Sequence, residues 1–127
     1  MKKLTLISLF VLSFFSISAC SSFDSPSTVV KKFYSYIEAG KVNDAYELIT
    51  KDGKEMLQKY SGVSVLSDLT RKIKSKNGIN EIKIKNEEIT GDTAKVYFEL
   101  LYGNGTKKDD SEELIKENGA WHITVSK

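Results

Sequence analysis

The sequence predicts an α+β domain in which N-terminal helices pack on a curved antiparallel four-stranded sheet. Between residues 26 and 76, apolar side chains recur every three or four positions, which is the period of a helix with one buried face. After Gly78 the period changes to two, as in strands with one covered face. Helices first and consecutive strands afterwards are typical of an α+β architecture.

Four helices are expected in the first half of the domain. Ser25-Pro26 begins the first, because serine is a favourable N-cap and proline suits the first helical position, and Gly40 ends it. The second is expected to stop at Asp52-Gly53, a short third follows, and the fourth covers residues 63–76. The apolar stripes of the four helices are, in order, Val30, Phe33, Tyr34 and Ile37; Val42, Ala45, Tyr46 and Ile49; Met56, Leu57 and Tyr60; and Leu66, Leu69 and Ile73.

The second half of the domain alternates apolar and polar residues in four runs. The apolar members are Ile82 and Ile84; Ala94, Val96, Phe98 and Leu100; Leu114 and Ile115, where the pattern is weaker; and Trp121, Ile123 and Val125. Turns are expected at Gly91-Asp92, at Gly103-Asn104-Gly105 and at Asn118-Gly119, the last being a strong hairpin signal. Strands connected in this way form a meander, and the helices must cover one of its faces.

Alternation assigns side chains to the two faces of that sheet. The face of Val96, Phe98, Trp121 and Ile123 is expected to be covered, whereas His122 points the other way. The inward-facing side chains expected on helices and strands then include no acid, base or metal ligand. Protein interiors normally pack without voids, so a filled core is favoured over an open pocket between helices and sheet.

The N-terminal residues have the pattern of a secretory signal peptide. Lys2 and Lys3 precede an apolar run, and no further charge occurs before Asp24. The tetrapeptide Ile17-Ser18-Ala19-Cys20 resembles the lipobox of bacterial lipoproteins. The resemblance implies cleavage just before Cys20 and acylation of its sulfur, so that this residue becomes the lipid-bearing N-terminus.

This interpretation divides the chain into a signal peptide at 1–19, a lipidated cysteine with a short tether at 20–25, and one domain at 26–127. An uncleaved transmembrane anchor is disfavoured because serine and threonine residues dilute the apolar run. An ordinary secreted protein needs no cysteine at its cleavage point. Two or more acyl chains hold a protein firmly at a membrane. Cys20 is the only cysteine, so no intramolecular disulfide can form.

The charge of the mature protein excludes one class of function. Lys2 and Lys3 leave with the signal peptide, so the basic residues fall from 19 to 17 and balance the 17 acidic ones. A neutral domain argues against nucleic acid binding, which requires a basic excess. The charge is nevertheless segregated, because residues 71–85 are basic and residues 86–117 acidic. We expect two solvated faces, and the alternative is a basic patch that rests on anionic lipid headgroups.

Few residues are candidates for catalysis or metal binding. His122 is the only histidine, and we expect it to lie at the surface rather than to act as a base. Neither a second histidine nor a cysteine pair is available for a zinc site. The run Asp109-Asp110-Ser111-Glu112-Glu113 lacks the glycine and the spaced glutamate of a calcium loop, so a solvated acidic hairpin is expected. The sequence predicts no cofactor, no metal site and no catalytic residue.

Several segments resemble a family of small bacterial lipoproteins catalogued as a domain of unknown function. They are Ser25-Pro26 followed by Val30-Lys-Lys-Phe33-Tyr34, then Asp44-Ala45-Tyr46-Glu47-Leu48, and near the end Asn118-Gly119-Ala120-Trp121-His122-Ile123. That family belongs to the nuclear-transport-factor-2-like (cystatin-like) superfamily, so the resemblance implies a cone-shaped α+β fold. It implies no chemistry, because the matching residues are caps, turns and core positions.

The sequence therefore predicts a membrane-anchored lipoprotein of the cell envelope whose domain binds and does not catalyse. The membrane is the partner of the lipid anchor, and the domain is expected to bind an envelope protein or a small apolar ligand. The alternative is a small-molecule enzyme with a pocket inside the cone. Ser21 stands where, in the enteric sorting rule, an aspartate retains lipoproteins at the inner membrane, which favours the outer membrane where the organism has one.

Overall fold

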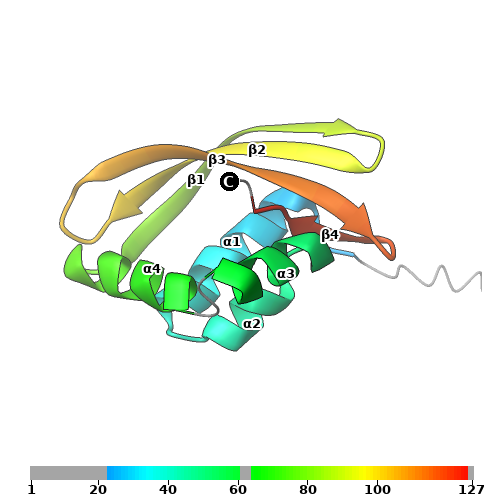
Figure 1. Cartoon of the computed structure of the whole chain (residues 1–127). Helices are drawn as coiled ribbons and strands as arrows, with labels where there is room; N and C mark the ends of the chain where they lie inside the picture. Colours follow the sequence, from blue (N-terminus) through cyan, green and yellow to red (C-terminus); the bar gives the residue numbers. More distant parts are fainter. Residues whose placement is uncertain (1–22, 61–63, 126–127) are drawn as a thin grey trace, which may run out of the picture.

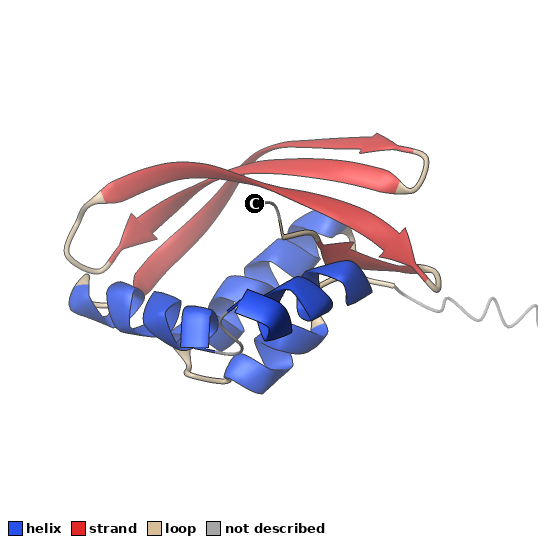
Figure 2. Ribbon diagram, in the orientation of Figure 1, coloured by secondary structure: helices blue, strands red, loops and turns tan. Residues whose placement is uncertain are grey.

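The computed structural model describes residues 23–60 and 64–125, so the expected signal peptide, Cys20 and Val63 lie outside the described residues. The elements are α1 (Pro26–Glu38), α2 (Val42–Glu47), α3 (Lys51–Tyr60), α4 (Ser64–Ser75), β1 (Ile79–Thr90), β2 (Thr93–Tyr102), β3 (Lys107–Glu117) and β4 (Ala120–Ile123). The antiparallel sheet has the order β1-β2-β3-β4 and curves over the helices (Figures 1 and 2). This confirms the predicted α+β fold. None of the described helices has the length and apolar character that crossing a membrane requires.

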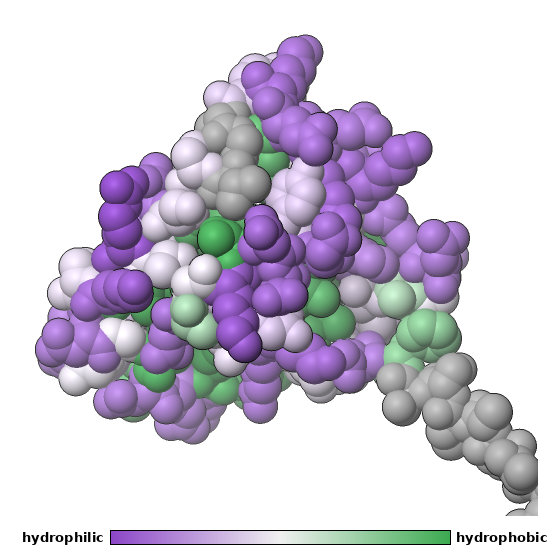
Figure 3. All heavy atoms as spheres, turned by 90° about the horizontal axis from the view of Figure 1, so that it is seen from below, coloured by the Kyte–Doolittle hydropathy of each residue, from purple (hydrophilic) through white to green (hydrophobic). Residues whose placement is uncertain are grey.

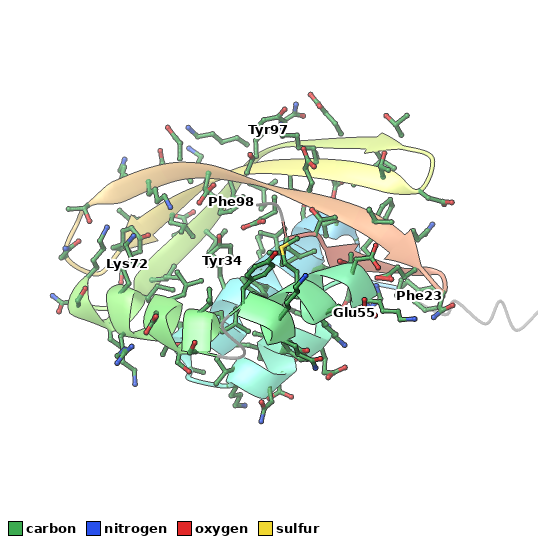
Figure 4. All side chains as sticks on the ribbon, in the orientation of Figure 1. Phe23, Tyr34, Glu55, Lys72, Tyr97 and Phe98 are labelled. Carbon is green, nitrogen blue, oxygen red and sulfur yellow. The ribbon has the colours of Figure 1, made fainter. Side chains whose placement is uncertain are left out.

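The core lies between α1 and the inner face of the sheet. The Thr28 N–H donates to the Ser25 side chain at 3.2 Å, which caps α1 as predicted. Alternate residues of β2 are buried, and Figure 4 shows Phe98 on the helical side of the sheet and Tyr97 on the other. The buried apolar side chains at the centre of this core are Val30, Phe33, Tyr34 and Ile37 of α1 and Ala94, Val96, Phe98 and Leu100 of β2.

The second helix is shorter than predicted, and Asp52-Gly53 does not end it. α2 stops at Glu47, and Ile49 instead forms a parallel bridge with Ile123 of β4. Gly53 lies in the first turn of α3, where an added Cβ would approach Ile49 Cγ2 to 2.7 Å. Gly53 therefore permits close packing of α3 on the segment before it, and its role is not that of a helix stop.

β3 is longer than predicted, and its acidic segment forms a strand rather than a hairpin. The register runs from Thr93 opposite Ile115 to Leu101 opposite Lys107, so all five residues 109–113 pair with β2. Aspartate is disfavoured in strands by itself, but pairing with a neighbouring strand overrides that weak preference. The connecting turn lies earlier, at residues 103–106.

The last strand has the register that alternation predicts. Trp121 is 7% exposed and belongs to the core, whereas His122 is half-buried on the opposite face. The His122 ring nitrogen Nδ1 lies 3.0 Å from the carbonyl oxygen of Ala120. Asn118 and Gly119 both have positive φ, 51° and 79°, as the predicted tight hairpin turn requires.

Candidate functional site

The inner face of β3 carries polar side chains where the inner face of β2 carries apolar ones. Residues at alternate positions of a strand share a face, so the face of buried Leu114 continues through Glu112 and Asp110 to Lys108. The opposed pairs of the two strands are Val96 with Glu112, Phe98 with Asp110, and Leu100 with Lys108. We call Lys108, Asp110 and Glu112 the inner row of β3.

Tyr34 of α1 holds Glu112. Its hydroxyl donates to Glu112 Oε1 at 2.9 Å. Tyr34 is only 5% exposed, and its ring packs against Phe33 and Phe98 at centroid distances of 5.4 and 5.3 Å. Figure 4 shows Tyr34 and Phe98 between the helices and the sheet. The hydrogen bond therefore joins the central helix to the inner row of β3.

Burial raises the pKa of the Glu112 carboxyl from 4.5 to about 7, although the hydrogen bond from Tyr34 lowers it. The negative charge of Asp110 raises this pKa further, and Lys108 lowers it. Burial, followed by the charge of Glu112, raises the pKa of the Tyr34 phenol well above its ordinary value. Near neutral pH, Glu112 is thus about half protonated beside a phenol that keeps its proton.

The other two residues of the inner row, Lys108 and Asp110, pair with each other. Lys108 Nζ lies 3.1 Å from Asp110 Oδ2, and this hydrogen bond raises the pKa of the lysine. Both side chains are more open to solvent than Tyr34. The row therefore changes along the strand from a more exposed ion pair to a partly buried carboxyl.

Glu112 shows that the expectation of an inner face without acids or bases was wrong. The acidic run was interpreted as a solvated turn, which hid the alternation within it. The signal was present in Leu114, because counting back by two residues from an inward leucine places Glu112 and Asp110 on the same face. His122, the candidate catalytic base considered from the sequence, points to the outer face of β4, whereas Glu112 lies on the inner face of β3.

Three adjoining hollows surround Thr124, which follows β4, and we call them the Thr124 groove. One, of about 370 Å³, lies against β2 and β3, and a second of the same volume lies beside the start of α3. The third, of about 180 Å³, includes Glu112 in its lining. The apolar residues that line the groove are Met56, Ala94, Leu114, Ile115 and Val125, and its hydroxyl groups come from Thr50, Thr90, Thr93, Ser111 and Thr124.

The lysines at the end of α4 lie at one end of the domain. The Asn104 N–H donates to the Lys76 carbonyl at 3.0 Å, which ties the end of α4 to the β2–β3 turn. Lys72 and Lys74 are exposed there, and Lys76 Nζ lies 4.4 Å from the centroid of the Tyr102 ring. Figure 4 shows Lys72 at this end and Phe23 at the other.

The described residues do not assemble a metal site. Within residues 23–60 and 64–125, no three side chains of the types His, Cys, Asp and Glu are grouped so that they could hold a metal ion. Cys20, the predicted lipidation site, lies outside these residues. Glu112 itself offers hydrogen bonding and proton exchange.

Solved structures with the same architecture place the domain in a known fold class. A protein from Campylobacter jejuni, provisionally named an NTF2-like transpeptidase, has a TM-score of 0.69 and 19% identity, over 81% of this chain and 100% of that one. A SEC-C motif containing protein from Rhodopseudomonas palustris has a TM-score of 0.59 and 14% identity, over 80% and 76%. The domain thus has the nuclear-transport-factor-2-like fold.

The family is narrower than the fold. The family described as a domain of unknown function, DUF4878, matches residues 18–124, and the chain belongs to it. None of the curated proteins matches the sequence. The family and the fold carry no catalytic assignment for this chain.

Proposed function

We propose that this protein is a lipid-anchored domain of the bacterial cell envelope that acts by binding. The lipobox-like segment ending in Cys20 supports the anchor. The structure is compatible with cleavage at that point, because α1, the first element among the described residues, begins at Pro26, six residues later. Removal of residues 1–19 leaves every described helix and strand in place.

The Thr124 groove is the observation that carries the binding role. Ile115 is 41% exposed and lines two of the three hollows, one of them together with Met56 and Val125. Threonine hydroxyls and charged residues surround this apolar centre. An apolar centre with a hydrogen-bonding rim is the usual organisation of a protein-binding surface. We therefore favour an envelope protein as the partner, with a small, largely apolar ligand as the alternative.

The Tyr34–Glu112 pair favours a second candidate, an enzyme. A carboxyl with a pKa near 7 is suited to general acid–base catalysis. One structural neighbour is provisionally named a transpeptidase, but at 19% identity the likeness extends to the fold alone. Tyr34 is only 5% exposed, and the hollow that includes Glu112 in its lining is the smallest of the three in the groove, at about 180 Å³, so we rank binding first.

Metabolic labelling with a fatty acid tests the anchor. The wild type should incorporate label, and Cys20→Ala should not, because the acylated sulfur is gone. Ser22→Ala is the matched control and should be labelled like the wild type. Label retained by Cys20→Ala would contradict the lipoprotein assignment.

Photo-crosslinking in intact cells tests the binding surface. A photoreactive amino acid at position 115 should give a discrete adduct with an envelope protein, because this side chain lies in the Thr124 groove. The control is position 83, an exposed residue of the outer face of β1. The same adduct at both positions, or none at 115, would speak against the groove. A catalytic role would show instead as turnover that is lost in Glu112→Gln.

A further inference from the structure

We infer that the domain stands on the bilayer by the end that carries Phe23 and Ile89, with the basic end of α4 pointing away from the membrane. This orientation rests on the lipid anchor proposed above. We call the membrane-facing part the tether end, and define it as Phe23, the first turn of α1, the end of β1 from Glu88 to Thr90 with the β1–β2 turn, and the β3–β4 turn.

The chain is fixed to the domain from Phe23 onward. The Phe23 ring lies over the β3–β4 turn, because a Cβ added to Gly119 would come within 3.5 Å of Phe23 Cε2. Asp24 forms an ion pair with Lys32 of α1. The backbone N–H and the hydroxyl of Ser27 both donate to Glu87 Oε1 of β1, at 2.9 and 2.8 Å. Contacts from α1, β1 and the β3–β4 turn therefore hold the start of the domain.

The covalent reach of the linker follows from this attachment. Phe23, which packs on the domain, lies three residues after Cys20. The backbone distance between these two residues is therefore at most about 11 Å. The two turns of the tether end lie side by side, since the Lys116 N–H donates to the Asp92 carbonyl at 2.8 Å. An acylated Cys20 therefore keeps both turns near the headgroups.

The basic end lies too far away to share that position. β2 runs from Thr93, beside the tether end, to Tyr102, beside Lys76, and ten residues of a strand extend about 33 Å. The length of β2 therefore exceeds the span of about 11 Å between Cys20 and Phe23. Lys72 and Lys74 could meet the same bilayer only if the domain lay on its side.

The surface of the tether end suits a lipid–water interface. Phe23 is 56% exposed and Ile89 is 53% exposed, although both are large apolar side chains. Large apolar side chains such as phenylalanine and leucine insert at the boundary between headgroups and acyl chains when a protein lies on a membrane. Figure 3, which views the helices from below, shows a mostly hydrophilic face with apolar surface beside the start of the described chain. Exposed Glu88 and Asp92 give no attraction to anionic lipids. The tether end is therefore held at the membrane by the acyl chains on Cys20 and by its apolar side chains.

The competing orientation is driven by charge. A bilayer rich in anionic lipid attracts exposed lysines at its surface, and the cluster at the end of α4 could draw the domain onto its side. That arrangement would bring position 74 to the headgroups and lift position 92 into water. The two orientations thus make opposite predictions for two labelled positions.

Nitroxide labels on the acylated full-length protein test the orientation. Asp92→Cys and Lys74→Cys each add one free thiol, because the sulfur of Cys20 is acylated. In phosphatidylcholine vesicles and in vesicles rich in phosphatidylglycerol, the label at 92 should show the collision profile of the interface, with raised oxygen and reduced nickel-chelate accessibility. The label at 74 should remain in water. A label at 74 at the headgroups, with 92 in water, would overturn the orientation but leave the anchor intact. Protein that is not acylated and does not bind vesicles would contradict the proposed function itself.

A second variant tests Phe23 separately. In the protein labelled at 92, Phe23→Ser should shift the label toward the aqueous profile, because the ring that enters the interface is lost, while fatty-acid incorporation is unchanged. Tyr60→Ser, at an aromatic residue that is 65% exposed on α3, is the matched control and should leave the label at the interface. An unchanged profile in Phe23→Ser would remove Phe23 from the contact.

Discussion

The inner faces of β2 and β3 differ in character although the two strands pair residue by residue. β2 places Val96, Phe98 and Leu100 in the core, and all three are nearly or fully inaccessible. β3 places its inner row opposite them, and every member of that row has a polar partner. Buried apolar surface stabilises the fold directly, whereas buried polar groups are tolerated only when they are hydrogen-bonded. The inner face of β2 therefore stabilises the fold through buried apolar surface, whereas the inner face of β3 carries Glu112, the carboxyl with the raised pKa.

The position of β3 near the rim of the sheet explains part of this difference. β4 pairs only with residues 114–117 of β3, and the Thr124 N–H reaches the Glu113 carbonyl at 2.9 Å. Among the described residues, no strand pairs with residues 107–112 on that side. Inward-pointing charges near an open edge discourage pairing with other chains. This accounts for Lys108 and Asp110, but it does not require a partly buried carboxyl at Glu112.

The largest expected effect comes from β2. Phe98→Ala should lower the free energy of unfolding by about 3–5 kcal/mol, because the ring is fully buried and leaves a cavity. Tyr97→Ala, its neighbour on the outer face, should cost less than about 1 kcal/mol. Urea unfolding of the two variants measures the difference. Equal losses would mean that the assigned faces of β2 are wrong.

Glu112→Gln should change how stability depends on pH. The folded-state pKa of about 7 lies above the ordinary 4.5, so the stabilising contribution of protonated Glu112 is complete below about pH 4.5 and is lost as pH rises through 7. The loss amounts to about 3 kcal/mol at most. The variant should lack this loss when unfolding is followed from about pH 5 to about pH 8.

Glu113→Gln is the matched control for that measurement, because residue 113 is exposed on the outer face of the same strand. It should reproduce the pH dependence of the wild type. If Glu112→Gln also follows the wild-type curve, burial does not raise the pKa of Glu112.

Tyr34→Phe should have a smaller effect. Removing the hydroxyl deletes one hydrogen bond and should lower the free energy of unfolding by about 1 kcal/mol. The same change removes the interaction that lowers the Glu112 pKa, so this pKa should rise further. Tyr36→Phe, two residues along α1, is the control and should leave the titration of Glu112 unchanged. A fall of the Glu112 pKa in Tyr34→Phe would contradict the assigned hydrogen bond.

Much of the fold could be predicted from the sequence, and the misses have physical causes. Alternation around Trp121 and the Asn118-Gly119 turn predicted the last hairpin, because both signals are local. The stop assigned to Asp52-Gly53 was wrong, since the close approach of Ile49 that requires Gly53 is a tertiary contact. The strand state of the acidic segment is likewise imposed by its pairing with β2. The inward face of Glu112 could have been found by counting back from Leu114, but its pairing with Tyr34 could not, because the two residues are 78 apart in sequence.

The titration of the Glu112 side-chain carboxyl, followed by the ¹³C chemical shift and assigned by its absence in Glu112→Gln, tests the central claim most directly. The account predicts a midpoint near pH 7, because Glu112 is partly buried beside Tyr34 on the inner face of β3. A midpoint near the ordinary value of 4.5 would mean that the carboxyl is solvated, and the inner row of β3 would then be no more than a charged strand edge.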